Sequence, residues 1–161
     1  MSSIASAFSN FAEMPAQLGE KIDIIQTVKL ALEIFNEQQI EFSYELNDVQ
    51  VNIDRAQMVR IITNLIKNAL QACESIENPL IQVIIKKNKN NVFIDIKDNG
   101  TGISIPIRNK IFEPNFTTKS SGMGLGLGMV KNIVNSYDGE ITFTSKVNHG
   151  TTFSIYFPIL K

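Results

Sequence analysis

Two pairs of strand-like segments, each joined by a turn-rich linker, constrain the fold of this chain more than any other feature. They comprise residues 80–87 and 92–97 around Asn88-Lys89-Asn90-Asn91, and residues 140–146 and 151–157 around Asn148-His149-Gly150. Asparagine and glycine in a short linker favour a tight turn, because both tolerate the backbone conformations that turns require. Each pair therefore predicts an antiparallel hairpin.

Amphipathic stretches before, between and after these hairpins predict three helices. The first follows Asp23, with Gln26 in a capping-box pattern; the second follows Asp54, with Gln57 in the same relation; the third covers 126–137. The apolar faces of the first two consist of Ile24, Val28, Ala31, Leu32 and Phe35, and of Met58, Ile61, Ile62, Leu65, Ile66 and Ala69. Alternating runs at 40–46 and 49–53 predict two further strands. Because hairpins separate the helices, the pattern predicts an α+β two-layer sandwich, with helices on one face of a mixed, mostly antiparallel sheet.

The length of 161 residues is that of one domain, which we expect at 20–161. Residues 1–19, broken by Pro15 and Gly19, are expected to be the end of a preceding helix and a linker. A net charge of −1 gives no electrostatic reason to expect nucleic acid or a membrane surface as a partner. The single Cys73 excludes an internal disulfide and suits a reducing compartment, and no apolar run reaches the roughly 20 residues of a transmembrane helix.

Asn64 and Asn68 lie four residues apart in the second predicted helix, so both side chains project from one side of it. Asparagine is a mediocre helix former, because its side chain competes for backbone hydrogen bonds. Two of them inside an otherwise favourable helix indicate a specific partner, and an amide oxygen is a suitable neutral ligand for Mg²⁺. The solvated face of an amphipathic helix is the simpler explanation for the pair taken alone.

Asp98 ends a predicted strand and precedes Asn99-Gly100-Thr101-Gly102. A carboxylate at that position can accept a hydrogen bond from an exocyclic amine, and the glycines would let a flat ring approach the backbone. Ordinary turn chemistry explains the same residues. In the long segment that follows, Lys119 can reach a terminal phosphate or remain a solvated loop lysine. Long segments of this composition in compact domains are typically lids or disordered.

Glycine occupies every second position from Gly122 to Gly128, directly before the last predicted helix. Such a backbone turns tightly and can bring its N–H groups against a bulky anion, and the helix start adds the positive end of its dipole. The spacing is not that of a phosphate-binding loop ending in Gly-Lys-Ser/Thr, and the strand that opens a dinucleotide fingerprint is missing. The run alone is therefore weak evidence for a phosphate site.

The order of four short motifs carries more information than any one of them. They are Asn-x-x-x-Asn-Ala at 64–69, Asp-x-Gly-x-Gly at 98–102, Phe-x-Pro-x-Phe at 112–116 and Gly-x-Gly-x-Gly at 122–126. This order closely resembles the N, G1, F and G2 boxes of the ATP-binding catalytic domain of bacterial sensor histidine kinases, in the ATPase superfamily shared with gyrase, Hsp90 and MutL. The resemblance covers about residues 20–160 and implies the Bergerat ATP-binding fold. Residues 6–20 also resemble the exit from the dimerisation helix of nitrogen-regulation-type sensor kinases.

The resemblance implies ATP and Mg²⁺ as cofactors and assigns roles to individual residues. It implies that Asn68 ligates Mg²⁺ while Asn64 assists at the phosphates, and that Asp98 receives the adenine amino group. It implies that Gly100 and Gly102 shape the adenine pocket. Lys119 and the backbone of Gly122, Gly124 and Gly126 would hold the β- and γ-phosphates under a mobile lid, residues 104–124. The other pocket residues that it implies are Ile103, Phe112, Thr118, Leu125 and Leu127.

The residue at position 64 separates phosphoryl transfer from hydrolysis. ATP-hydrolysing relatives carry an acid four residues before the Mg²⁺-binding asparagine, as a base for water, whereas Asn64 cannot accept a proton at neutral pH. Such a site suits transfer to a nucleophile supplied from elsewhere, with Asn64, Asn68 and Lys119 contributing positioning and charge neutralisation. Many sensor kinases carry a basic or aromatic residue near position 71, where this chain has Gln71, which puts that phosphate contact in doubt.

No His-Glu or His-Asp phosphoacceptor motif occurs, and His149 lies in a predicted turn. We therefore expect a catalytic domain that acts on a histidine of a dimerisation domain of the same kinase, with a response regulator as the second partner. The expected location is the cytoplasm, with membrane anchoring of the parent kinase left open. A stand-alone serine kinase of the anti-sigma-factor type, and a nucleotide-sensing interaction module without transferase activity, remain the alternatives.

Overall fold

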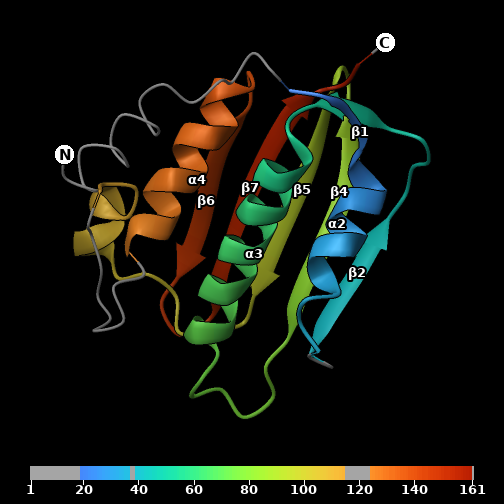
Figure 1. Cartoon of the computed structure of the whole chain (residues 1–161). Coiled ribbons are helices and arrows are strands. Elements are labelled where there is room, and N and C mark those ends of the chain that lie inside the picture. The colour runs from blue at the N-terminus through green and yellow to red at the C-terminus, as the bar shows by residue number, and fades with distance from the viewer. Residues whose placement is uncertain (1–18, 37–38, 115–123, 161) are drawn as a thin grey trace, which may run out of the picture.

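A five-stranded mixed sheet with helices on one face forms the body of the molecule (Figure 1). The structure is a computed structural model, and it describes residues 19–36, 39–114 and 124–160. The strands are β1 (Lys21–Asp23), β2 (Ile40–Tyr44), β3 (Gln50–Asn52), β4 (Ile81–Asn88), β5 (Asn91–Asp98), β6 (Glu140–Lys146) and β7 (Gly150–Pro158). The helices are α2 (Ile24–Leu32), α3 (Arg55–Ala72), the 3₁₀-helix η2 (Ile105–Lys110) and α4 (Gly124–Ser136). The predicted α+β two-layer sandwich is confirmed.

The main sheet has the strand order β2-β4-β5-β7-β6. Both predicted hairpins are present, β4 with β5 and β6 with β7, and their turns place Lys89 and Asn148 at positive φ. Among the strand pairs of the described residues, only β2–β4 is parallel, which makes the sheet mixed. The register sets Asp98 at the end of β5 opposite Thr151 of β7, so the two hairpins join directly beside the predicted adenine contact.

The core lies between this sheet and the three α-helices. Alternate residues of the central strands, such as Val83, Ile94 and Ile155, are fully buried beneath them. Isoleucine and valine suit such positions because their branched side chains pack well on a pleated surface. Full burial of each stabilises the fold by roughly 1.5–3 kcal/mol before entropy is counted. The opposite face of the sheet carries mainly polar residues.

The starts of α2 and α3 follow the capping pattern. The Asp23 carboxylate accepts a hydrogen bond from the Gln26 backbone N–H at 3.1 Å. The Asp54 carboxylate accepts hydrogen bonds from the N–H groups of Ala56 and Gln57, at 2.8 and 3.3 Å. These bonds satisfy donors that the first helical turn leaves without an intrahelical partner, and they fix where α3, the helix that carries both asparagines, begins.

Three short elements differ from the sequence expectation. β1 was not predicted; it pairs with β3 in a separate two-stranded antiparallel sheet. The segment predicted to be irregular contains η2, which has a proline at its start. α4 covers Gly124–Ser136 where 126–137 was predicted, so Gly124 and Leu125 of the glycine-rich run are helical as well. Tertiary packing determines where these elements form, and neither a three-residue strand nor a glycine-rich sequence carries a local pattern that predicts it.

The described residues provide a limited test of the other chain-level expectations. None of the helices within them combines the length and hydropathy needed to cross a bilayer. Cys73 is a free, buried thiol, as predicted. The helix end expected at residues 1–19 lies, except for Gly19, outside the described residues, and the division at residue 20 stays a prediction.

Removing the cap of α3 should destabilise the whole domain. We expect Asp54→Ala to lower the free energy of unfolding by about 1 kcal/mol, because two N–H groups lose their acceptor. Urea unfolding followed by circular dichroism measures the change. Asp54→Asn, which keeps an acceptor oxygen, is the matched control and should lose much less. Equal losses for both variants would contradict a capping role.

Candidate functional site

Asp98 is the buried polar centre of the candidate site. Its side chain is 5% exposed. One carboxylate oxygen accepts hydrogen bonds from the Gly100 N–H at 2.9 Å and from the Thr151 N–H at 3.3 Å. Burial raises the pKa of the Asp98 carboxyl, and these two hydrogen bonds oppose that rise only in part. The end of β5 therefore carries a buried acceptor whose charged form is costly to bury.

The backbone after Asp98 lies against α3 and against the β6–β7 turn. The Thr101 N–H donates to the Ala72 carbonyl at 3.0 Å, at the end of α3. A side chain at Gly100 would collide with that same carbonyl group. Gly102 adopts a φ of +78° and lies against the Lys146 carbonyl, where a larger residue would be both strained and obstructed. These glycines therefore permit close backbone packing of this segment against α3 and β6.

Two hydroxyl residues that the sequence analysis did not single out complete the support of this segment. Ser145 Oγ accepts a hydrogen bond from the Ile103 N–H at 2.8 Å and lies 2.8 Å from Thr151 Oγ1. Thr151 is 5% exposed, and its N–H also binds Asp98. The Arg108 side chain donates to the Ile103 carbonyl at 3.0 Å. Ile103 thus has a fixed backbone, and the β6–β7 hairpin holds the residues around Asp98.

Asn64 and Asn68 lie on α3, and Asn64 faces the start of α4. A Cβ atom added to Gly126 would lie 3.5 Å from Asn64 Oδ1, so the helical glycine allows the two helices to approach at that point. Asn68 Nδ2 is buried and has no hydrogen-bond partner among the described residues. Buried amide groups rarely stay unpaired, so this group indicates a ligand oxygen at the site.

The donor set fits a magnesium ion that arrives with phosphates. The described residues contain no cluster of three or more His, Cys, Asp or Glu that could hold a metal by itself. Mg²⁺ is commonly held by one or two protein oxygens together with substrate phosphates and water. The half-buried amide of Asn68 suits that arrangement, because its oxygen can ligate the ion while its unpartnered nitrogen donates to a phosphate oxygen.

Phe112 packs against aromatic residues of β6 and β7 and against α4. The Phe112 ring packs edge-on against Phe143 and Phe153, with centroid distances of 5.9 and 6.4 Å. A Cβ atom on Gly128 would lie 3.0 Å from the Phe112 carbonyl oxygen. Leu127 packs partly buried against the core. The structure therefore gives Phe112 a packing role that anchors η2 beside α4.

Comparisons with known proteins agree with this geometry. Residues 53–161 match the family described as "Histidine kinase-, DNA gyrase B-, and HSP90-like ATPase". The chain belongs to this family. Sporulation kinase A of Bacillus subtilis is 33% identical over 95% of this chain and 24% of its own length. An NtrY-like sensor histidine kinase of Rickettsia prowazekii is 30% identical over 97% of this chain and 27% of its own length.

A solved structure narrows the type within the family. The nucleotide-free catalytic domain of histidine kinase ThkA superposes with a TM-score of 0.75 at 26% identity, covering 87% of this chain and 95% of that chain. The chain is thus an ATP-binding catalytic domain of the sensor histidine kinase type. It spans about a quarter of the length of the curated relatives it matches.

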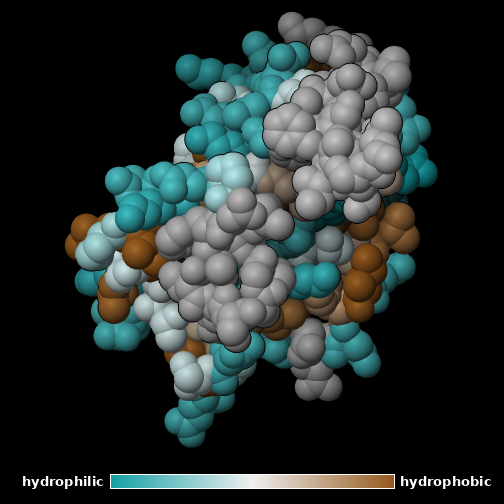
Figure 2. Space-filling model, turned by 60° about the vertical axis from the view of Figure 1, so that its left-hand side comes forward, coloured by the Kyte–Doolittle hydropathy of each residue, from teal (hydrophilic) through white to brown (hydrophobic). Residues whose placement is uncertain are grey.

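Not all residues that the resemblance assigned can be placed in this family site. Thr118, Lys119 and Gly122 lie outside the described residues, as does most of the second half of the expected lid. Gly124 and Leu125 open α4. The N–H groups of a helix's first turn have no intrahelical partner, so this helix start still offers backbone donors beside Asn64. The described surface on this side of the molecule mixes hydrophilic and hydrophobic residues (Figure 2).

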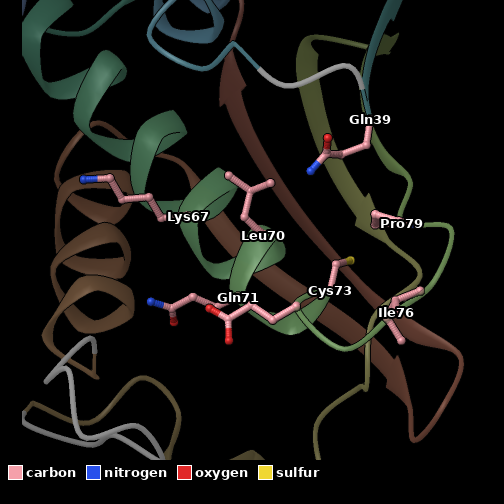
Figure 3. A pocket seen from close by; sticks show the side chains of 8 residues that line it. Gln39, Lys67, Leu70, Gln71, Cys73, Ile76 and Pro79 are labelled. Atoms are coloured by element: carbon pink, nitrogen blue, oxygen red, sulfur yellow. The ribbon is translucent and has the colours of Figure 1, made fainter.

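A cavity of about 490 Å³ lies beside the C-terminal half of α3. Figure 3 shows Lys67 and Gln71 extending from one side of this helix, away from Cys73, Ile76 and Pro79. The lining holds one lysine and one glutamate, so it has no charge preference. Burial raises the pKa of the Cys73 thiol, and its sulfur lies 3.6 Å from Asn99 Oδ1. The Cys73 thiol is therefore a packing group. At position 71, where many sensor kinases carry a basic or aromatic residue, the neutral Gln71 supplies no positive charge.

The raised pKa of Asp98 predicts a pH-dependent effect of its replacement. Because folding raises the pKa of Asp98, the protonated carboxyl favours the folded state. This contribution to the stability of wild type is complete below the unfolded pKa of about 3.9. It is lost as the pH rises through the higher folded pKa. Asp98→Asn removes this titration while keeping an acceptor oxygen. We therefore expect its stability relative to wild type to rise with pH over that window.

Urea unfolding at a series of pH values measures the effect. The matched control is Asp138→Asn, which removes an exposed carboxylate in a left-handed conformation that asparagine also tolerates. If Asp98→Asn instead lost stability relative to wild type as the pH rose, a stabilising role for the charged form would have to replace this account.

Proposed function

We propose that this domain binds Mg²⁺-ATP between α3, residues 98–103 and the start of α4, and transfers the γ-phosphoryl group to a histidine of a separate dimerisation domain. The observation that carries the proposal is the buried amide nitrogen of Asn68, which has no hydrogen-bond partner among the described residues, together with the buried acceptor Asp98. Both hydrogen bonds to the Asp98 carboxylate go to one oxygen, so the second oxygen is available to a base, and the Asn68 amide is available to a phosphate or metal.

The residues of this site have distinct proposed roles. Asp98 accepts a hydrogen bond from the adenine amino group, and Gly100 and Gly102 let the ring approach the backbone. Asn68 ligates Mg²⁺, which neutralises phosphate charge, while Asn64 binds the phosphates. Lys119, with the N–H groups of the glycine-rich segment that ends in α4, would bind the β- and γ-phosphates. The support for the last role is the sequence and the position of the glycine-rich segment at the start of α4.

The chemistry of Asn64 favours transfer to a protein nucleophile over hydrolysis. Its neutral amide cannot take the proton of an attacking water at neutral pH. In the proposed step an imidazole nitrogen forms a bond to the γ-phosphorus, and the bond from that phosphorus to the β–γ bridging oxygen breaks, which releases ADP. The domain contributes positioning and electrostatic stabilisation.

The proposed partners follow from this step. They are the dimerisation domain that carries the acceptor histidine and a response regulator that takes the phosphoryl group onward. The nitrogen-regulation subtype is supported by the NtrY-like relative and by the sequence of residues 6–20. The use of ATP supports a cytoplasmic location for the domain.

Nucleotide binding provides the first test. We expect isothermal titration calorimetry with Mg²⁺ and ADP or ATP to show saturable binding to this chain at or below millimolar concentrations. Asn68→Ala should weaken binding at least about tenfold, because a charge-assisted contact contributes roughly 1.5–3 kcal/mol. Asn132→Ala, the same change at an exposed position of α4, should leave binding unaltered. Absence of binding by wild type would refute the proposal.

Phosphoryl transfer provides the second test. The chain alone, incubated with γ-labelled ATP, should incorporate no label. With a dimerisation domain that carries a histidine fused before residue 1, we expect label that acid removes and alkali does not, as for a phosphoramidate. Label resistant to acid, on a serine, would favour the serine-kinase alternative. Unchanged labelling in the Asn68→Ala variant would contradict the proposed role of that residue.

A further inference from the structure

We propose that a second site, a cavity beneath the β6–β7 turn, binds a small oxyanion of the phosphate or sulfate type. The cavity has a volume of about 230 Å³ and lies at the end of β5, β6 and β7. The side chains that carry its chemistry are those of Lys97, Thr144, Lys146, His149 and Thr152, with Asp98 at its inner edge. The inference is independent of the proposed kinase function.

The strand register gathers three of these side chains into one row. Lys97 of β5 is opposite Thr152 of β7, and Thr152 is opposite Thr144 of β6. Directly opposed residues on neighbouring strands have side chains about 5 Å apart on one face. The face is the one turned away from the helices, because the adjacent residues Ile96 and Phe153 are buried in the core. The row therefore presents an ammonium group beside two hydroxyl groups.

The exposed part of the lining is cationic. Lys97 and Lys146 are exposed, and within the described ranges neither forms an ion pair. By contrast, Lys86 on the same face pairs with Asp95 at 2.9 Å. The one carboxylate in the lining, that of Asp98, is buried and already accepts two backbone N–H hydrogen bonds. Two unpaired ammonium groups around one hollow favour a multiply charged anion over a neutral ligand.

His149 adds a ring nitrogen at the turn. Its Nδ1 atom lies 3.1 Å from the Val147 carbonyl oxygen. A carbonyl oxygen only accepts hydrogen bonds, so Nδ1 carries the hydrogen, and the ring lines the cavity wall while the lysine and threonine side chains are the donors to an anion. The turn itself is held in place, because the Asn148 N–H donates to the Thr101 carbonyl at 2.8 Å. The cavity wall is therefore preorganised rather than formed by a loose loop.

The size of the cavity selects the ligand class. Small-molecule pockets are typically about 300–1,000 Å³, so about 230 Å³ is too small for a nucleotide but admits one tetrahedral anion. The hydroxyl groups of Thr144 and Thr152 provide donors for its oxygens. A free phosphate or sulfate ion and a phosphoryl group on a peptide present the same tetrahedral oxygens. The experiment below distinguishes these two ligands.

Sulfate titration of the whole chain tests the site. We expect saturable shifts of the ring resonances of His149, the one histidine of this chain, and of the amide resonances of 97 and 144–152 at constant ionic strength. Lys97→Gln combined with Lys146→Gln should raise the sulfate dissociation constant roughly fivefold or more, the scale of two exposed charge pairs. The control Lys86→Gln removes a charge from the same face outside the cavity and should leave the constant unchanged.

Three outcomes would overturn the proposal. The first is shifts that rise linearly with sulfate concentration, and the second is a sulfate dissociation constant in the double variant equal to that of wild type. The third is an equal loss of sulfate affinity in the Lys86→Gln control, which would indicate diffuse surface charge. A parallel titration with inorganic phosphate and with a phosphoserine peptide identifies the source. Tighter binding of the peptide assigns the site to a phosphorylated protein, and equal binding assigns it to the free anion. Repetition with saturating Mg²⁺-ADP keeps this test separate from nucleotide binding, since the shifts should persist.

Discussion

The close backbone packing of residues 98–102 between α3 and the β6–β7 turn is the constraint on which the site depends. Gly100 lies against the Ala72 carbonyl, and Gly150 lies against the Asp98 carbonyl, at a φ of +123°. No side chain fits at either position without displacing backbone. Because the end of α3 and the end of β5 are joined at this point, Asn68 and Asp98 reach one site although they come from different layers of the sandwich (Figure 1).

This packing also explains how a costly group is retained. The Asp98 carboxylate is removed from water, which destabilises its charged form. The two backbone N–H groups that bind it exist in the right place only because β7 pairs with β5 in one register and the chain turns sharply at Gly100. Burial of the Asp98 carboxylate therefore lowers the stability of the fold, and the packing of the surrounding sheet offsets this loss. Such a loss is common at residues that serve function.

Sequence reasoning predicts the elements of this fold better than their junctions. The β4–β5 hairpin and α3 could be predicted because eight-residue strands and an 18-residue helix carry many periods of their pattern. β1 has three residues and no pattern of its own, and its partner is set by packing. The start of α4 was misplaced by two residues because glycine is a poor helix former, yet Gly124 begins the helix. Gly126 and Gly128, which were predicted to be helical, allow close approach to Asn64 and Phe112.

The same distinction holds for the candidate site. Asn68 and Asp98 lie in short motifs of recognisable spacing, so the sequence points to them directly. Ser145 and Thr151 support Asp98 and Ile103 through contacts that span long stretches of chain, and only the pairing of β5, β6 and β7 reveals them. A serine and a threonine in a strand give no local signal of such a role, because most are simply surface residues.

The alternation of β5 gives two neighbouring residues opposite environments. Successive side chains of a strand point to opposite faces, so Asp98 turns toward the helices and the candidate nucleotide site while Lys97 turns to the open face. A one-residue slip of β5 against β7 would exchange them, burying an ammonium group under α3 and leaving the acceptor in water. Such a slip would also move Ile94 and Ile96 out of the core, and its cost in buried apolar area far exceeds any gain from solvating Asp98. The hydrophobic residues of the strand therefore enforce the register that buries Asp98 and leaves Lys97 exposed.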